Sequence, residues 1–362
     1  MRALRTTSIV LCLLLALVGT PLGFALFEFW LFMKSPGSPH LEIRQVTIRP
    51  GMNAATVAQL LATEGIVADS EKFYWLCRLR QVGQRLKAGE YAFLPLSTPG
   101  QILEQMVLGK AVIQRVTFPE GSTVFDVART LEEKGLASSK EILRLIGDRD
   151  FIKANGLNTA SLEGYLFPET YFFQRIQGEG AMLQMMVSQF RRHLPNGWEQ
   201  QSAELGLTLH ELVTVASMVE KEAVADFERP RIAGVFYNRL KRKMPLQSDP
   251  TAVYDLSGFS GPISKSHLKR PSPYNTYQHQ GLPAGPICNP GAKSLKAALY
   301  PEKVSYLYFV SNRDGTHQFS ETLAEHNRAV ARSQQKGRDL QHGGDARLIL
   351  QPSAQGNEFL EE

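Results

Sequence analysis

The longest apolar stretch of the chain lies at its N-terminus. A charge-free run from Thr6 to Phe27 follows two arginines, and apolar residues resume after Glu28 until Lys34. A helix needs about 20 apolar residues to cross a bilayer, and positive charges on a short flank stay in the cytoplasm. We therefore expect residues 1–34 to form a cytoplasmic stub and a single-pass transmembrane anchor, with the rest of the chain outside the cytoplasm.

A cleaved signal peptide is the alternative interpretation of this segment. Residues 23–25 read Gly-Phe-Ala, the small-x-small pattern of a cleavage site. A cleaved precursor turns polar after the cut, whereas this chain continues with Leu26, Phe27, Phe29 and Trp30. The pattern therefore favours an anchor.

An internal repeat follows the linker at residues 35–40, which is rich in serine and proline. Residues 46–51 (VTIRPG) match residues 116–121 (VTFPEG), and the match continues through apolar positions to Gly65 and Gly135. Each copy predicts a short strand, a Pro/Gly turn and a helix that ends at the glycine. Residues 86–91 also match residues 162–165. Two unrelated units with coincident glycines remain the alternative.

The repeat predicts an α+β fold, because a unit of this size cannot bury its own apolar face. We expect a small α+β module at residues 41–112 and a larger α+β domain at residues 113–335, which contains the second copy. Residues 336–362 are polar and glycine-rich, and we expect a flexible tail there.

A helix from residue 209 to residue 223 carries two candidate carboxyl groups. Thr208 and Glu211 form a capping-box pattern at its start. Glu220 and Glu222 flank the buried stripe on opposite sides, and Lys221 points away from it. A carboxyl at the border of a buried stripe is partly desolvated, which raises its pKa towards that of a general acid. Periodicity does not choose between the two, and the plainer alternative is that both are solvated.

Three downstream segments combine turn residues with polar side chains, at residues 247–251, 272–277 and 281–291. Rigid loops with Tyr, Asn, Asp and Gln suit sugar binding, although they also suit plain structural loops. After them, residues 304–310 predict a strand, residues 317–319 a second alternating run, and residues around His326 a terminal helix.

Composition narrows the classes of function. The chain has 362 residues, 43% of them hydrophobic and 21% charged, which excludes disorder of the whole chain. The net charge of +5 suits an acidic polymer or a membrane surface and is too dilute to indicate nucleic acid. Three cysteines exclude a disulfide-stapled scaffold. His317 and His326 lack a carboxylate at metal-site spacing, and no phosphate-binding loop occurs. We expect no metal, no cofactor and no nucleic acid.

Ordered motifs along the chain resemble one known family, the endolytic murein transglycosylases (MltG/YceG-like). The resemblance covers the anchor to about residue 335. The matching motifs are LEGYLFPETY (162–171), ASMVEKE (216–222), FYNRL (236–240), LQSDPT (246–251), YNTY (274–277), GLP (281–283), NPG (289–291) and YFV (308–310). Ala284 stands where the family often has proline.

The resemblance implies a LysM-like module near the membrane and a catalytic domain that cuts peptidoglycan without hydrolysis. The cut falls between N-acetylmuramic acid and N-acetylglucosamine and leaves a 1,6-anhydro end. In the family motif the second glutamate is catalytic, which is Glu222 here, and Glu220 is its variable neighbour. We expect Gln247, Asp249, Asn275 and Tyr277 to position the substrate or stabilise the transition state. Glu163 is either a further substrate-binding candidate or a cap for the repeat.

The implied partners are peptidoglycan glycan strands, the cytoplasmic (inner) membrane, and penicillin-binding proteins or other wall-synthesis proteins. We expect the domains to be periplasmic and the enzyme to terminate elongation of nascent strands. Three other interpretations stay open. The first is a non-catalytic wall-binding scaffold. The second is a hydrolytic muramidase that uses Asp249 within about 5–10 Å of Glu222, and the third is a polyanion-binding protein.

Overall fold

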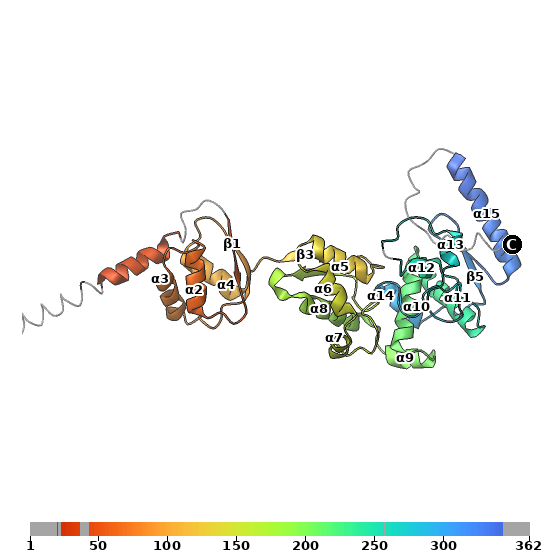
Figure 1. The fold of residues 1–362 in the computed structure, drawn as a ribbon, viewed down its shortest axis with the longest axis horizontal. Helices are drawn as coiled ribbons and strands as arrows, with labels where there is room; N and C mark the ends of the chain where they lie inside the picture. Colours follow the sequence, from red (N-terminus) through yellow and green to blue (C-terminus); the bar gives the residue numbers. More distant parts are fainter. Residues whose placement is uncertain (1–19, 21–22, 37–42, 257, 343–362) are drawn as a thin grey trace, which may run out of the picture. The chain divides into compact units, whose positions relative to one another are not determined.

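The computed structural model describes residues 20, 23–36, 43–256 and 258–342, and these form two compact units (Figure 1). One unit comprises the described residues up to Arg115 together with Phe172–Gln177, and the other comprises Val116–Tyr171 and the described residues from Gly178 onward. The described helices include none that is long and apolar enough to cross a membrane. Most of the predicted anchor lies outside the described residues, so it stays a prediction.

The first unit folds three helices against a two-stranded antiparallel sheet, and a further helix at its N-terminal end adds to their core. Its elements are a helix over residues 23–34, β1 (Arg44–Ile48), α2 (Ala54–Thr63), α3 (Ser70–Leu79), β2 (Gly89–Phe93), α4 (Pro99–Leu108) and the 3-10 turn η1 (Arg175–Gln177). Asn53 and Asp69 cap α2 and α3, and Thr98 begins α4 with a capping box.

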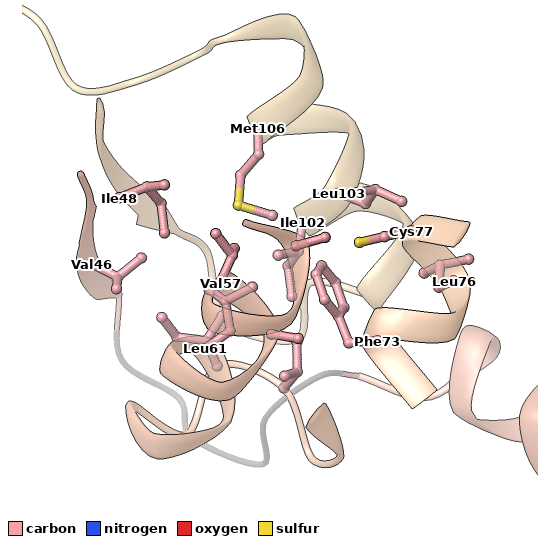
Figure 2. Close-up of a cluster of buried hydrophobic side chains, with 14 of the residues drawn as sticks. Val46, Ile48, Val57, Leu61, Phe73, Leu76, Cys77, Ile102, Leu103 and Met106 are labelled. Carbon is pink, nitrogen blue, oxygen red and sulfur yellow. The ribbon is translucent and has the colours of Figure 1, made fainter. Parts of the chain in front are cut away.

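The core of this unit lies between the sheet and the three helices. Figure 2 shows side chains from β1, α2, α3 and α4 converging on one another, among them Ile48, Leu61, Phe73 and Met106. The helix over residues 23–34 joins this core through Phe32, which is buried in the same cluster. The unit therefore has a hydrophobic core of its own.

The second unit is larger and mostly helical. Its elements are β3 (Gln114–Thr117, which begins in the first unit), α5 (Val124–Glu133), α6 (Ser139–Ile146), α7 (Arg149–Ala154), β4 (Thr170–Phe173, which ends in the first unit), α8 (Glu179–His193), α9 (Trp198–Glu204), α10 (Leu209–Glu222), η2 (Asp226–Glu228), α11 (Arg229–Lys241), α12 (Asp249–Val253), α13 (Lys265–Leu268), α14 (Ala292–Leu299), β5 (Tyr308–Ser311), β6 (His317–Ser320) and α15 (Leu323–His342). Helix α10 packs against α11 and α14 (Figure 1), and β5 pairs with β6 beside α15. The expected mixture of helices and short strands is confirmed.

The internal repeat is present as two units that each run from a strand through helices to a second strand, with two helices in the first copy and three in the second. Its second half is aligned differently from the prediction. Residues 162–165, the predicted counterpart of residues 86–91, lie in a turn. The counterpart is strand β4, because Tyr171 donates to the carbonyl of Phe167 just as Tyr91 in β2 donates to that of Lys87. Both bonds are 2.7 Å long and span four residues. The motifs LKAGEY and LEGY are similar in sequence because both contain a glycine before a tyrosine, but they do not occupy equivalent positions in the fold.

Two further elements differ from their predicted extent. The strand predicted at residues 304–310 is formed only from Tyr308 onward, since the carbonyls of Val304 and Tyr306 accept from the Asn238 side chain instead of a neighbouring strand. Helix α15 continues to His342, into the segment expected to be a flexible tail. Residues 343–362 lie outside the described residues.

Candidate active site

The two candidate glutamates lie in the last turn of α10. The helix begins with the predicted capping box, in which the Thr208 side chain and the Glu211 side chain satisfy each other's backbone N–H groups. Its apolar stripe is buried, and Lys221 is exposed as expected. The alternative that both glutamates are solvated is wrong, because Glu222 is 5% exposed and the Glu220 side chain is also 5% exposed.

Glu220 is held as the partner of a buried cation. Its carboxylate forms an ion pair with Arg229 at 3.0 Å and accepts from the backbone N–H of Gly291 at 2.9 Å. Arg229 also contacts Asp226 and Ser294. Both of these contacts commit the Glu220 carboxyl group to the fold, since they tie the end of α10 to Arg229 and to the backbone at Gly291.

Glu222 has a different environment. The Ser248 hydroxyl donates to Glu222 Oε1 at 2.6 Å, whereas Oε2 makes no hydrogen bond within the described part of the chain and keeps some contact with solvent. The pKa of Glu222 is raised from its usual 4.5 to about 8, mainly by burial. The hydrogen bond from Ser248 and the charge of Arg239 lower this pKa, and the charge of Asp249 raises it. The side chain is therefore protonated at neutral pH and suited to general acid catalysis.

Two of the predicted loops meet beside Glu222. The backbone N–H groups of Gln247 and Ser248 bond to Thr276, and the Thr251 and Thr276 hydroxyls lie 2.8 Å apart. Gln247 has a φ of +49°, a conformation that L-residues rarely adopt. This network brings the loop at residues 247–249 next to the end of α10.

Asp249 and Tyr277 form a second polar pair at the same place. Asp249 is buried, and the Tyr277 hydroxyl donates to its Oδ1. Burial raises the pKa of Asp249 above its usual value, and the bond from Tyr277 counteracts part of that rise. Since Asp249 also raises the pKa of Glu222, the two carboxyl groups are electrostatically coupled. The structure therefore brings Gln247, Asp249 and Tyr277 into the neighbourhood of Glu222.

Asn275 is buried and uses its side chain to hold its own loop. Its Nδ2 donates to the carbonyls of Leu268 and Arg270 at 3.1 and 2.7 Å, and its Oδ1 accepts from the backbone of Tyr277 at 3.1 Å. The amide is occupied by these contacts. It acts on the site by fixing Tyr277, while a direct contact with substrate stays a prediction.

Glu163 lies beside the start of α5. Its Oε2 accepts from the backbone N–H of Val124 at 3.0 Å and from the Tyr254 hydroxyl at 2.8 Å. Val124 is the first residue of α5, so Glu163 caps the helix of the second repeat, as one of its two predicted roles required. Burial raises the pKa of Glu163 to about 7, and its Oε1 is buried without a partner among the described residues.

Sequence reasoning assigned no role to two residues of this site, Ser248 and Arg239. Both lie within motifs that the resemblance rests on, LQSDPT and FYNRL. Arg239 follows Ile232 and Phe236 at helical spacing, so a charged residue stands in the buried stripe of α11. A charged residue in a buried stripe can be recognised in the sequence and marks Arg239 as a candidate functional residue. The contact of Ser248 with Glu222 depends on tertiary structure and leaves no such signal. Within the described residues, no group of three His, Cys, Asp or Glu side chains is placed to hold a metal ion.

Comparisons with known proteins agree on one family. The model of the YceG-like family matches residues 46–332. The chain is 31% identical over 300 residues to an endolytic murein transglycosylase of Bacillus subtilis, a match that covers 78% of this chain and 83% of that protein. It is 28% identical over 319 residues to the endolytic murein transglycosylase of Streptococcus pneumoniae D39, covering 79% of this chain and 57% of that protein.

A solved structure supports the fold. The crystal structure of a YceG-like protein from Listeria monocytogenes matches with a TM-score of 0.55 and 33% sequence identity, over 79% of this chain and 98% of that one.

Proposed function

Since this chain belongs to the YceG-like family, we propose that it is an endolytic murein transglycosylase, an enzyme that cuts peptidoglycan strands internally. The observation that carries the proposal is the contrast between two neighbouring glutamates. Glu220 is committed to Arg229, whereas Glu222 is buried, protonated and left with one carboxyl oxygen that keeps solvent contact. The relatives from Bacillus and Streptococcus bear the same enzyme name.

A single carboxyl group suffices for this chemistry. Glu222 Oε2 donates its proton to the oxygen of the bond between N-acetylmuramic acid and N-acetylglucosamine as that bond breaks. The carboxylate formed then accepts the proton of the muramyl C6 hydroxyl, whose oxygen attacks C1 of the same sugar. The product is a 1,6-anhydro end, and Glu222 is protonated again. Because the nucleophile belongs to the substrate, no water has to be activated.

Neighbouring residues fix the acid in place. The Ser248 hydroxyl holds Oε1, which directs Oε2 to the substrate. Tyr277 and Asp249 form a coupled pair that contacts hydroxyl groups of the sugar, and Gln247 adds an amide beside them. In its ionised form, Asp249 places a negative charge close to the positive charge that develops on the sugar ring in the transition state.

Digestion of purified sacculi tests the proposal. The wild-type protein releases muropeptides with anhydro ends, and Glu222→Gln releases none while it keeps its fold. Glu220→Gln is the matched control on the same helix, and we expect it to retain catalysis in whatever fraction is folded. Loss of activity in folded Glu220→Gln, or full activity in Glu222→Gln, would show that the wrong carboxyl group was chosen.

A hydrolytic muramidase is the second candidate, and the nearness of Asp249 to Glu222 favours it. In that enzyme Asp249 acts as nucleophile or base, and the products carry reducing ends with one added water. Mass spectrometry of the released muropeptides separates the two reactions. A wall-binding scaffold without activity releases nothing from sacculi, even when it binds them.

The proposed setting of the enzyme is the periplasmic face of the cytoplasmic membrane. The N-terminal apolar run supplies the anchor, and the first unit serves as a LysM-like module near the membrane. This position favours nascent strands, so cleavage terminates their elongation beside penicillin-binding proteins. Equal cleavage of old and new glycan by the full-length protein in cells would contradict this arrangement.

A further inference from the structure

Arg239 is a buried cation of the second unit that forms no ion pair with any residue the structure describes. It lies in α11, is 3% exposed, and contacts no carboxylate within the described residues at salt-bridge distance. Burying a charge without an opposite charge is costly. A stability argument alone would favour an apolar residue at this position, so the contacts of Arg239 call for another explanation.

The guanidinium group ties two separate segments together. Its Nε donates to the carbonyl of Leu307 at 2.6 Å, and its Nη1 donates to the carbonyl of Leu246 at 2.9 Å. Longer contacts of 3.3 Å reach the carbonyl of Pro245 and the Oε1 of Gln247. Only the planar fork of arginine reaches these acceptors together.

The segment that Arg239 holds leads directly to the candidate acid. Ser248 follows Gln247, and its hydroxyl donates to Glu222 Oε1 at 2.6 Å. Arg239 and Glu222 also lie close enough to interact electrostatically, and the cation lowers the pKa of the carboxyl group. Arg239 is thus connected to Glu222 through the loop and through space.

The other charged and titratable groups around this pair come from four elements. They are Asp249 of α12, Tyr277 of the loop between α13 and α14, Tyr308 of β5 and His326 of α15. Tyr308 presents its ring to the guanidinium at 5.2 Å, and burial, aided by Arg239, lowers the pKa of His326 to about 4. His326 is therefore neutral, and Arg239 is the cation that acts on Glu222.

We propose that Arg239 is a positioning residue for the transglycosylase reaction: it holds the loop that carries Ser248 to Glu222, and its charge stabilises the carboxylate that Glu222 becomes. This inference rests on the proposed function of Glu222. Before the reaction Glu222 is neutral, so it offers Arg239 no negative charge. When the proton moves to the glycosidic oxygen, a negative charge appears on Glu222 and the electrostatic interaction is gained. An interaction made only then lowers the barrier without tightening ground-state binding.

The test is the pH profile of glycan cleavage by the full chain with Arg239→Gln, Arg239→Lys and a control. The control is Arg231→Gln on the same helix, whose arginine is paired with Glu302 at 3.1 Å. Activity requires protonated Glu222, so it is lost as the pH rises through the pKa of that group. Removing the cation raises this pKa, and the alkaline limb of the Arg239→Gln profile moves to higher pH while kcat falls about tenfold or more. We expect the control to keep the wild-type profile.

Each result supports or overturns the inference. A folded Arg239→Gln variant with the wild-type limb and rate overturns it. If that variant does not fold, Arg239→Lys tests the inference instead. Lysine retains the charge, so the alkaline limb of the pH profile should stay in place, and it lacks the planar guanidinium group, so kcat should fall. A wild-type kcat in Arg239→Lys overturns the positioning role, and a shifted limb overturns the electrostatic role. An active Glu222→Gln variant refutes the proposed function itself, a result distinct from both.

Discussion

The substitution Glu222→Gln should stabilise the protein at alkaline pH while it removes activity. A carboxyl group whose pKa is higher in the folded than in the unfolded state makes folding less favourable as the pH rises between the two values. For Glu222 these values are 4.5 and about 8. Each tenfold difference in proton affinity corresponds to about 1.4 kcal/mol. Compared with a variant that does not ionise, the wild-type protein therefore has a free energy of unfolding that is lower by about 1 kcal/mol at pH 5 and by about 4 kcal/mol at pH 8.

Urea unfolding at the two pH values measures this difference. Glutamine still accepts the hydrogen bond from Ser248, so the comparison isolates the ionisation. The free energy of unfolding of Glu222→Gln should exceed that of the wild type by about 1 kcal/mol at pH 5 and by about 4 kcal/mol at pH 8. An equal difference at both values would mean that Glu222 is ionised in the folded protein at neutral pH. The assignment of Glu222 as a general acid would then fail.

Three further predictions concern residues around the site. Glu220→Ala removes the buried ion-pair partner of Arg229, which keeps only the exposed Asp226, and should lower the free energy of unfolding by about 3 kcal/mol in a urea titration; an unchanged midpoint would contradict the pairing. Gly164→Ala places a Cβ 2.7 Å from Pro286 at a φ of +88°, and should lower stability by about 2–3 kcal/mol, visible as a drop in Tm by calorimetry. Asn275→Ala frees the loop it holds, so limited proteolysis should cut there faster and kcat should fall; wild-type resistance to proteolysis would argue against that role.

Local signals in the sequence were sufficient for the elements that carry the site. The capping box of Thr208 and Glu211 and the spacing of the apolar residues place α10 within one residue of its observed end. Gly65 and Gly135 lie just after their helices with φ values of +65° and +63°, as the C-cap pattern predicts. These features depend on interactions over a few residues, which a sequence pattern records directly.

The distinction between Glu220 and Glu222 required tertiary structure. The two are placed symmetrically about one helical stripe, so periodicity treats them alike. What separates them is Arg229 and Gly291 on one side and Ser248 on the other, residues brought there by other helices and loops. The family resemblance selected Glu222 without a physical reason, and the contacts now provide one. The role of Glu222 itself stays a prediction until the variants are measured.

The predicted strand at residues 304–310 shows a different limit. Alternating aromatic and aliphatic residues favour a strand, but the first half of this segment uses its carbonyls on Asn238 and Arg239 of α11. A pattern of side chains does not reveal which backbone groups will bond to distant side chains. The same limit applied to the repeat, where only the hydrogen bonds of Tyr91 and Tyr171 identified the equivalent strands.

Glu222 is the last residue of α10, and that location has a consequence for how its acidity is set. The aligned peptide dipoles of a helix place about half a negative elementary charge at its C-terminal end. Lysine or arginine is the favourable residue there, and a glutamate is disfavoured as an anion. The backbone itself therefore helps Glu222 to keep its proton, and no side-chain substitution removes that contribution. An engineer who wanted a stronger or weaker acid would adjust the surrounding side chains and leave the end of the helix where it is.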